Sequence, residues 1–173
     1  MSGLHVVPRE EVSSWGIRLQ VPTGWLTGRY IGEDPSQPWR VAVCGPQPDG
    51  GWDACETIAV FRFTGILPVG ILLASADRTL QALEAVDSTT AAIGESECAH
   101  ACGARSSGFF SAVGLWVWGQ YSYYLSNPDP CGRTLLVQHC LFAEAGRQAE
   151  LAEEIQLLTN AVQATSFVGN ADL

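Results

Sequence analysis

A Cys-X-His-X-Cys pattern is formed by Cys98, His100 and Cys102, residue types from which proteins build zinc sites. In an extended chain the two cysteines lie about 13 Å apart, too far to bind one tetrahedral ion. His139 and Cys140 would have to complete the site, but adjacent strand residues point to opposite faces. We therefore expect no metal site and no cofactor.

The six cysteines of the chain are interpreted as free, buried thiols. Disulfides stay open as an alternative, because Cys44 and Cys55 flank an expected hairpin connection. No G-x-S-x-G, phosphate-binding loop or G-x-G-x-x-G is present. We predict no catalytic residues. An enzyme would have to cluster its cysteines and histidines, and the sequence indicates neither a cleft nor an orienting partner.

Aromatic residues are the better candidates for contact with a partner. Trp25, Trp39 and Trp52 each border a loop rich in glycine and proline. Tryptophan, tyrosine and arginine are the residues that most often anchor protein interfaces. We predict that these three tryptophans bind another protein, and the alternative is that each closes one end of the core.

A second aromatic group lies in LWVWGQYSYYL, residues 115–125. Strand periodicity makes both of its faces apolar near Trp118, which is typical of a central strand covered on both sides. Its later part is more polar. We therefore expect Tyr123 and Tyr124 to reach the surface, and add them to the predicted binding residues.

The composition is that of one globular domain spanning 1–173, with its core at about 15–165. The net charge of −9 opposes binding to nucleic acid or to anionic membranes. No apolar run approaches the roughly 20 residues that span a bilayer, and no secretory signal is visible. We expect a cytoplasmic protein.

The periodicity predicts six strands and two helices, and the clustering of strands indicates an α+β fold with antiparallel hairpins. A turn at NPDPCG, residues 127–132, joins the last two strands. The expected strands are 17–22, 39–45, 57–63, 103–112, 115–125 and 133–143, and the expected helices are about 76–87 and 145–165.

VPTGW, FRFTG, ADRTLQAL, RSSGFFSAVGLWVWGQYSYYL and LLVQHCLFAE, in this order before a final amphipathic helix, resemble the LpqN-type proteins of actinobacteria. These are similar in turn to the PsbP-like superfamily. The resemblance covers about residues 15–165. It implies an α/β/α sandwich, a central antiparallel sheet of about six strands with helices on both faces. Its members are mainly non-enzymatic adaptors and assembly factors. LpqN-type proteins are typically lipoproteins, whereas this chain begins without a lipobox cysteine.

The leading prediction is a non-enzymatic protein-interaction or assembly domain in an actinobacterial cell, with a partner that the sequence does not identify. The second is a carrier of a small apolar ligand between a helix and the aromatic strand, lined by Trp118, Tyr121 or Tyr123. The third is a cysteine- or metal-dependent enzyme using Cys98, His100, His139 and Cys140.

Overall fold

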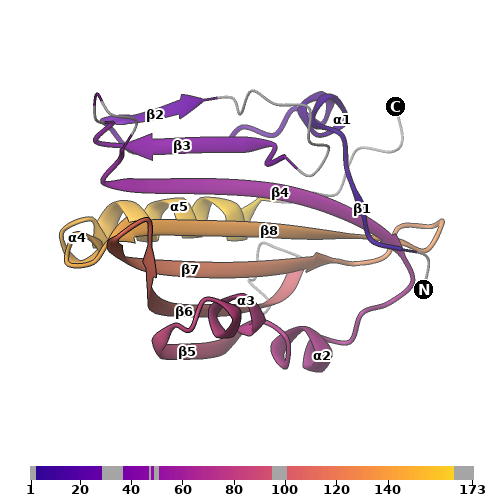
Figure 1. The fold of residues 1–173 in the computed structure, drawn as a ribbon. Coiled ribbons are helices and arrows are strands. Elements are labelled where there is room, and N and C mark those ends of the chain that lie inside the picture. Colours follow the sequence, from indigo (N-terminus) through magenta and orange to yellow (C-terminus); the bar gives the residue numbers. More distant parts are fainter. Residues whose placement is uncertain (1–2, 29–36, 47, 49–50, 95–100, 166–173) are drawn as a thin grey trace.

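A large antiparallel sheet organises the computed structural model, which describes residues 3–28, 37–46, 48, 51–94 and 101–165 (Figure 1). Within these residues the sheet has eight strands in the order β2-β3-β4-β8-β7-β6-β5, and β1 pairs with β4. The strands are β1 (His5–Val6), β2 (Trp25–Gly28), β3 (Arg40–Cys44), β4 (Ala54–Thr64), β5 (Val86–Ile93), β6 (Ala101–Ala112), β7 (Leu115–Ser126) and β8 (Arg133–Glu144). The helices are α1 (Arg9–Ser14), α2 (Val69–Leu73), α3 (Arg78–Ala82), α4 (Arg147–Glu150) and α5 (Ala152–Ala164).

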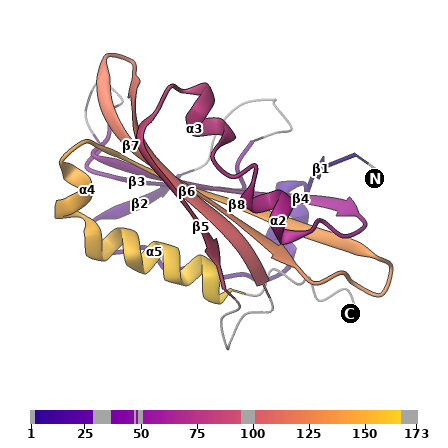
Figure 2. The same ribbon diagram turned by 90° about the horizontal axis from the view of Figure 1, so that it is seen from below.

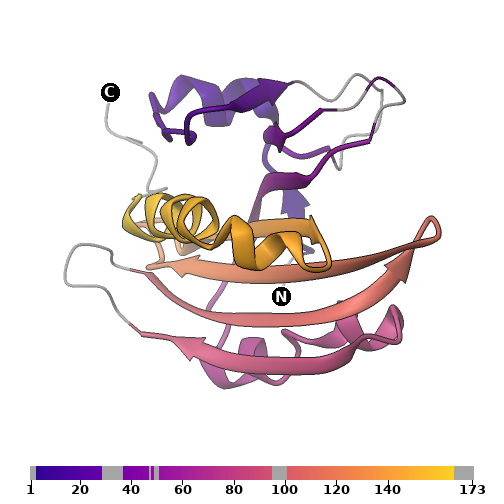
Figure 3. The same cartoon turned by 90° about the vertical axis from the view of Figure 1, so that its left-hand side faces the viewer.

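Helices lie on both sides of the sheet, as Figures 2 and 3 show. On one side, Leu158 of α5 packs with Leu141 of β8. On the other, Leu80 of α3 packs with Tyr121 and Cys140. Leu141 and Cys140 are neighbours in one strand, so β8 is covered on both faces. We call the two sides the α5 face and the α3 face.

The aromatic stretch 115–125 forms most of β7, which lies between β6 and β8. Its first two residues, Leu115 and Trp116, are exposed, and burial begins at Val117. The prediction of a central strand is therefore confirmed. The prediction of about six strands is too low, because β1, β2 and β5 were not recognised. An α+β fold with a large antiparallel sheet is confirmed.

The predicted helix at 76–87 is wrong in its second half. The helix α3 ends at Ala82, and β5 begins at Val86. Glu84 has a φ of 53°, its amide donates to the carbonyl of Gln81, and the amide of Ala85 donates to that of Leu80. These are the two hydrogen bonds of a Schellman motif. Glycine is usual at the left-handed position, so the glutamate there gave no signal of a helix end.

The predicted strand at 17–22 is also wrong, because these residues pair with no strand. Their burial nevertheless alternates, with Ile17 and Leu19 partly buried and Arg18 and Gln20 exposed. The alternation in the sequence therefore predicted an extended segment correctly, but it did not show whether the segment pairs with another strand. The final helix begins at Ala152, since Leu151 separates it from the short α4.

Candidate binding site

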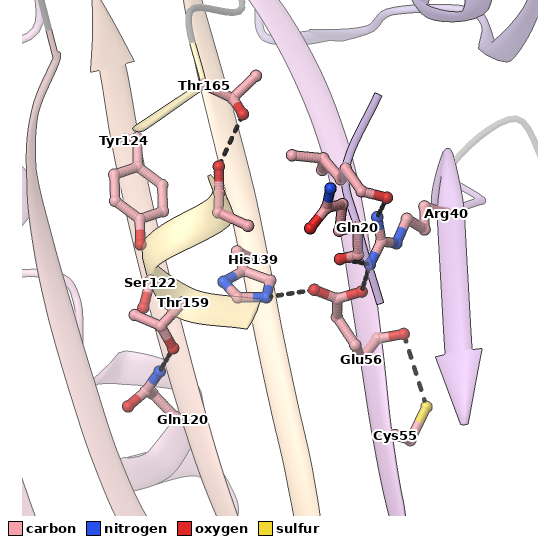
Figure 4. A network of polar contacts seen from close by, with 12 residues as sticks. Gln20, Arg40, Cys55, Glu56, Gln120, Ser122, Tyr124, His139, Thr159 and Thr165 are labelled. Carbon is pink, nitrogen blue, oxygen red and sulfur yellow. Dashed lines mark hydrogen bonds and ion pairs between the residues drawn. The ribbon is translucent and has the colours of Figure 1, made fainter. Parts of the chain in front are cut away.

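Three charged or ionisable side chains meet on the α5 face, each from a different strand (Figure 4). Glu56 of β4 forms an ion pair with Arg40 of β3, with 2.7 Å between Oε2 and Nη2. Its other carboxylate oxygen lies 2.9 Å from Nε2 of His139 on β8. Glu56 and His139 are fully buried, and Arg40 is nearly so. The sheet register explains the meeting, because Arg40 lies opposite Ile58, which in turn lies opposite His139.

The carboxylate of Glu56 can only accept hydrogen bonds, so Nε2 of His139 carries the hydrogen in this contact. The second ring nitrogen, Nδ1, has no hydrogen-bond partner among the described residues. Figure 4 places it on the side of the ring away from Glu56. Arg40 balances the buried charge of Glu56, as a buried carboxylate requires.

Polar contacts continue across the same face on β6 and β7. Arg105 donates from Nε to the hydroxyl of Ser122 at 2.9 Å and from Nη2 to the hydroxyl of Tyr124 at 3.3 Å. Gln120 donates to the hydroxyl of Thr159 at 3.3 Å, which joins β7 to α5. The α5 face therefore holds a buried polar layer between the sheet and its helix.

A serine, a histidine and a carboxylate invite comparison with a hydrolase relay, because Ser122 lies opposite His139 in the sheet. The geometry differs from that of a relay. The hydroxyl of Ser122 accepts from Arg105, and Ser122, His139 and Glu56 are all buried completely beneath α5. A nucleophile has to face its substrate, so this set is better explained as a structural network.

The network holds the segment of residues 17–20, which we call the strap. Arg40 donates from Nη1 to the carbonyl of Leu19 at 3.0 Å and from Nη2 to that of Gln20 at 3.5 Å. One guanidinium thus binds both the strap and Glu56, a use of several donors that a planar fork permits. Within the described residues, the amide groups of the strap donate no hydrogen bond.

A cleft lies on each side of the strap. The first, of about 980 Å³, separates the strap from α5, and its walls are Arg18, Leu19, Gln20, Ala152, Glu153, Gln156, Leu157, Asn160, Ala161 and Thr165. The second, of about 430 Å³, is lined by Arg9, Ile17, Arg18, Leu19, Thr27, Gly28, Trp39 and Arg40. Arg18 and Leu19 belong to both walls. The strap is therefore a fixed partition between two surface clefts.

The predicted binding residues are spread over the molecule. Trp39 lines the second cleft, and its indole donates to the hydroxyl of Ser13 at 3.3 Å. Trp25 is 5% exposed and packs in the core beneath α5. Trp52 is partly exposed in the connection between β3 and β4. The clefts thus contain one of the three tryptophans, and the roles of the others in binding stay predictions.

The two tyrosines divide between the faces of the sheet. Tyr124 is 4% exposed on the α5 face, so the prediction that it reaches the surface is wrong. Its hydroxyl meets Arg105, a partner that sequence reasoning did not identify. Tyr123 is partly buried on the α3 face, where burial raises the pKa of its hydroxyl.

The thiols do not form a reactive centre among the described residues. His139 and Cys140 point to opposite faces, and Cys98 and His100 lie outside the described part of the chain. Burial raises the pKa of Cys140 to about 12 and that of Cys55 to about 11, so both stay protonated near neutral pH. Cys44 and Cys55 are free thiols. Across the described chain, no group of three potential ligands is placed to hold a metal ion.

The fold is similar to that of LpqN, whose crystal structure is described as that of a protein involved in cell envelope biogenesis of Mycobacterium tuberculosis. The TM-score is 0.64 at 16% identity, over 83% of this chain and 79% of LpqN. The expected resemblance is thus confirmed for the fold. The human StarD13 lipid transfer and protein localization domain matches over 82% of this chain with a TM-score of 0.26, too low to support an argument. The sequence matches no family model and no curated protein.

Two further expectations concern membranes and location. Among the described helices, none is long and apolar enough to span a bilayer. A cytoplasmic location, the single-domain organisation and membership of the PsbP-like superfamily stay predictions.

Proposed function

We propose that the protein is a non-enzymatic domain that binds another protein along the strap. The observation that carries this proposal is a strap held by Arg40 from one side, with unused amide groups and a cleft on each flank. Extended peptides often bind by pairing their main chain with such a segment, while side chains enter adjacent pockets.

The first cleft suits an elongated partner. Its outer wall, α5, has 13 residues and is therefore about 20 Å long, which matches about six residues of extended chain. Leu157 is 45% exposed and offers an apolar anchor on that wall. Arg18 on the strap and Glu153 on α5 carry opposite charges across the cleft, so they favour a partner of defined direction.

Trp39, which the sequence predicted as a contact residue, lines the second cleft and would contact the partner there. A side chain of the partner entering there would meet the indole ring and Ile17. Trp52 and Tyr123 are partly exposed away from these clefts and stay separate proposals.

A carrier of a small apolar ligand is the second candidate, favoured by the size of the first cleft, which falls within the range of ligand sites. The space between a helix and the aromatic strand, where the sequence predicted the ligand, is less favourable for a ligand. Between α3 and β7, the side chains of Leu80, Phe110, Val117 and Tyr121 pack together.

The test is site-specific photo-crosslinking in the native cell. p-Benzoylphenylalanine replaces Gln156 on the cleft wall, and the control replaces Gln81, an exposed glutamine on α3. We expect a discrete protein adduct from position 156 only, lost when Leu157→Glu is added. Equal adducts from both positions would contradict the proposal, and an adduct with the mass of a small molecule would favour the carrier.

A further inference from the structure

The strand β5 forms one edge of the sheet, at the opposite end of the strand order from β2. Among the described strands it pairs only with β6, through a register that runs from Thr89–Ser107 to Ile93–Gly103. Seven of its eight residues are exposed, and Ile93 alone is buried. One side of its main chain therefore faces outward with donors and acceptors that no other strand uses.

Natural edge strands are usually protected by short length, lysine, proline or a bulge. The sequence of β5, VDSTTAAI, contains no lysine or proline, and its one charge is Asp87. A bulge lies between Val86 and Thr89, with Asp87 at a φ of 51°. This protects the beginning of β5 and leaves residues 89–93 regular. The opposite edge, β2, has only four residues.

We propose that β5 pairs with β5 of a second copy of this chain, so that two sheets join antiparallel across a two-fold axis. In self-pairing, opposed residues must be separated by an even number of positions, because outward main-chain groups recur at every second residue. A register centred on Thr90 satisfies this condition. It places Thr90 opposite Thr90 and Thr89 opposite Ala91, and it leaves the bulged residues 86–88 outside the regular pairing.

A second copy fits this edge because the pairing is self-complementary, as a two-fold interface requires. Threonine pairs opposite one another stabilise antiparallel strands. The chain carries a net charge of −9, so two copies can meet only where carboxylates are not opposed. Asp87 belongs to the bulge and not to the paired residues of the Thr90-centred register, so no charge faces its own copy.

The first experiment measures the oligomeric state of the full chain by sedimentation equilibrium. We expect a dimer for the wild type. Thr90→Lys places two ammonium groups opposite each other and should give a folded monomer, whose thermal unfolding midpoint is lower only by the stabilisation that dimer formation supplied. The control is Leu26→Lys on the exposed β2 edge, which should stay dimeric. A monomeric wild type, or a dimer that survives Thr90→Lys, would overturn the proposal.

The second experiment tests the register independently of stability. Directly opposed strand residues have Cβ atoms about 4.5–5.5 Å apart, close enough for Thr90→Cys to form an intermolecular disulfide after a small adjustment. Cys131 is an exposed native thiol, so the wild type and Leu26→Cys measure the background. We expect rapid, reducible dimers from Thr90→Cys alone. A yield no greater than the background would contradict this register.

Discussion

The two faces of β4, β8 and β7 differ in the polar side chains that they bury, although they are the two sides of the same strands. On the α5 face, Glu56 and His139 form a buried polar network with Arg40. On the α3 face, the ring of Tyr121 meets that of Phe142 edge to face at 5.6 Å and 81°, beneath α3. Adjacent residues such as His139 and Cys140 therefore belong to separate environments.

The difference teaches what each face contributes. Apolar packing stabilises a fold without much regard to direction, because it depends on the area removed from water. A buried ion pair adds little net stability but penalises any arrangement that leaves a charge unpaired. The α3 face therefore contributes stability by apolar packing, and the α5 face, which has apolar clusters of its own around Val162 and Leu158, also fixes the position of the strap. Four substitutions or conditions test this division, from the largest effect to the smallest.

The largest effect is expected for Glu56→Ala. Removing the carboxylate leaves Arg40 buried without its counter-charge, which typically costs about 3–5 kcal/mol. Urea unfolding measures the loss. Trypsin cleavage after the exposed Arg18 in the folded protein should also accelerate, because Arg40 is then free to leave the strap. A loss below about 1 kcal/mol would show that the network does not carry this role.

Leu80→Ala should cost slightly less, about 3 kcal/mol, because it opens a cavity in the α3 face. Urea unfolding is again the measurement. The matched control is Leu83→Ala at the exposed residue that follows α3, with a loss of about 1 kcal/mol or less. Trypsin cleavage after Arg18 in the folded protein should be unchanged in both variants. Faster cleavage there would contradict the separation of the two faces.

Alkaline pH should weaken the α3 face through its thiols. Burial raises the folded-state pKa of Cys140 to about 12 and that of Cys55 to about 11, from an ordinary value of 9.0. Their contribution is therefore complete below about pH 9 and is lost as pH rises toward the folded values. In this range the contribution of each thiol to the free energy of unfolding falls by about 1.4 kcal/mol per pH unit. Urea unfolding at pH 8 and pH 10 checks this.

A Cys140→Ala variant serves as the control, since it should show a shallower decline between pH 8 and pH 10 than the wild type. At pH 8 a thiol reagent should modify the exposed Cys131 in the folded protein and Cys140 only after unfolding. Modification of Cys140 in the folded protein would show that the α3 face is open.

The smallest effect is expected for Arg40→Lys. Lysine keeps the charge opposite Glu56 but lacks the fork that also reaches two strap carbonyls, so global stability should fall by about 1 kcal/mol. Trypsin cleavage after Arg18 in the folded protein should accelerate. An unchanged rate of cleavage there would show that the strap is held by other contacts.

The sequence predicted the parts of the fold that follow from local periodicity. The strands at 115–125 and 133–143 and the turn between them are confirmed, and so is the closing helix, whose Leu158 and Val162 are buried. Periodicity failed where tertiary structure decided. The end of α3 after Ala82 uses a left-handed Glu84, which no local pattern predicts, and β5 consists mostly of small residues that suit many conformations.

The candidate site was harder to predict, because its parts are far apart in the sequence. Arg40, Glu56 and His139 each lie in or beside an apolar run, and this was the available signal. A charged or ionisable residue in a buried strand needs a partner. The signal shows that partners exist without identifying them, since the β3–β4–β8 order is a property of the assembled sheet. The clefts have no sequence signal, because residues 17–20 and α5 meet only in the folded protein.

The pinning of the strap also has a consequence for the time course of folding. Its anchor requires Arg40, Glu56 and His139 to meet, and the last of these belongs to a strand that ends at Glu144. Contacts between such distant segments form late, after the entropy of closing long loops has been overcome. During synthesis, the strap in the first third of the chain therefore becomes anchored only after the last third has been made. The first cleft, whose outer wall is α5, therefore forms only after the last third of the chain has folded.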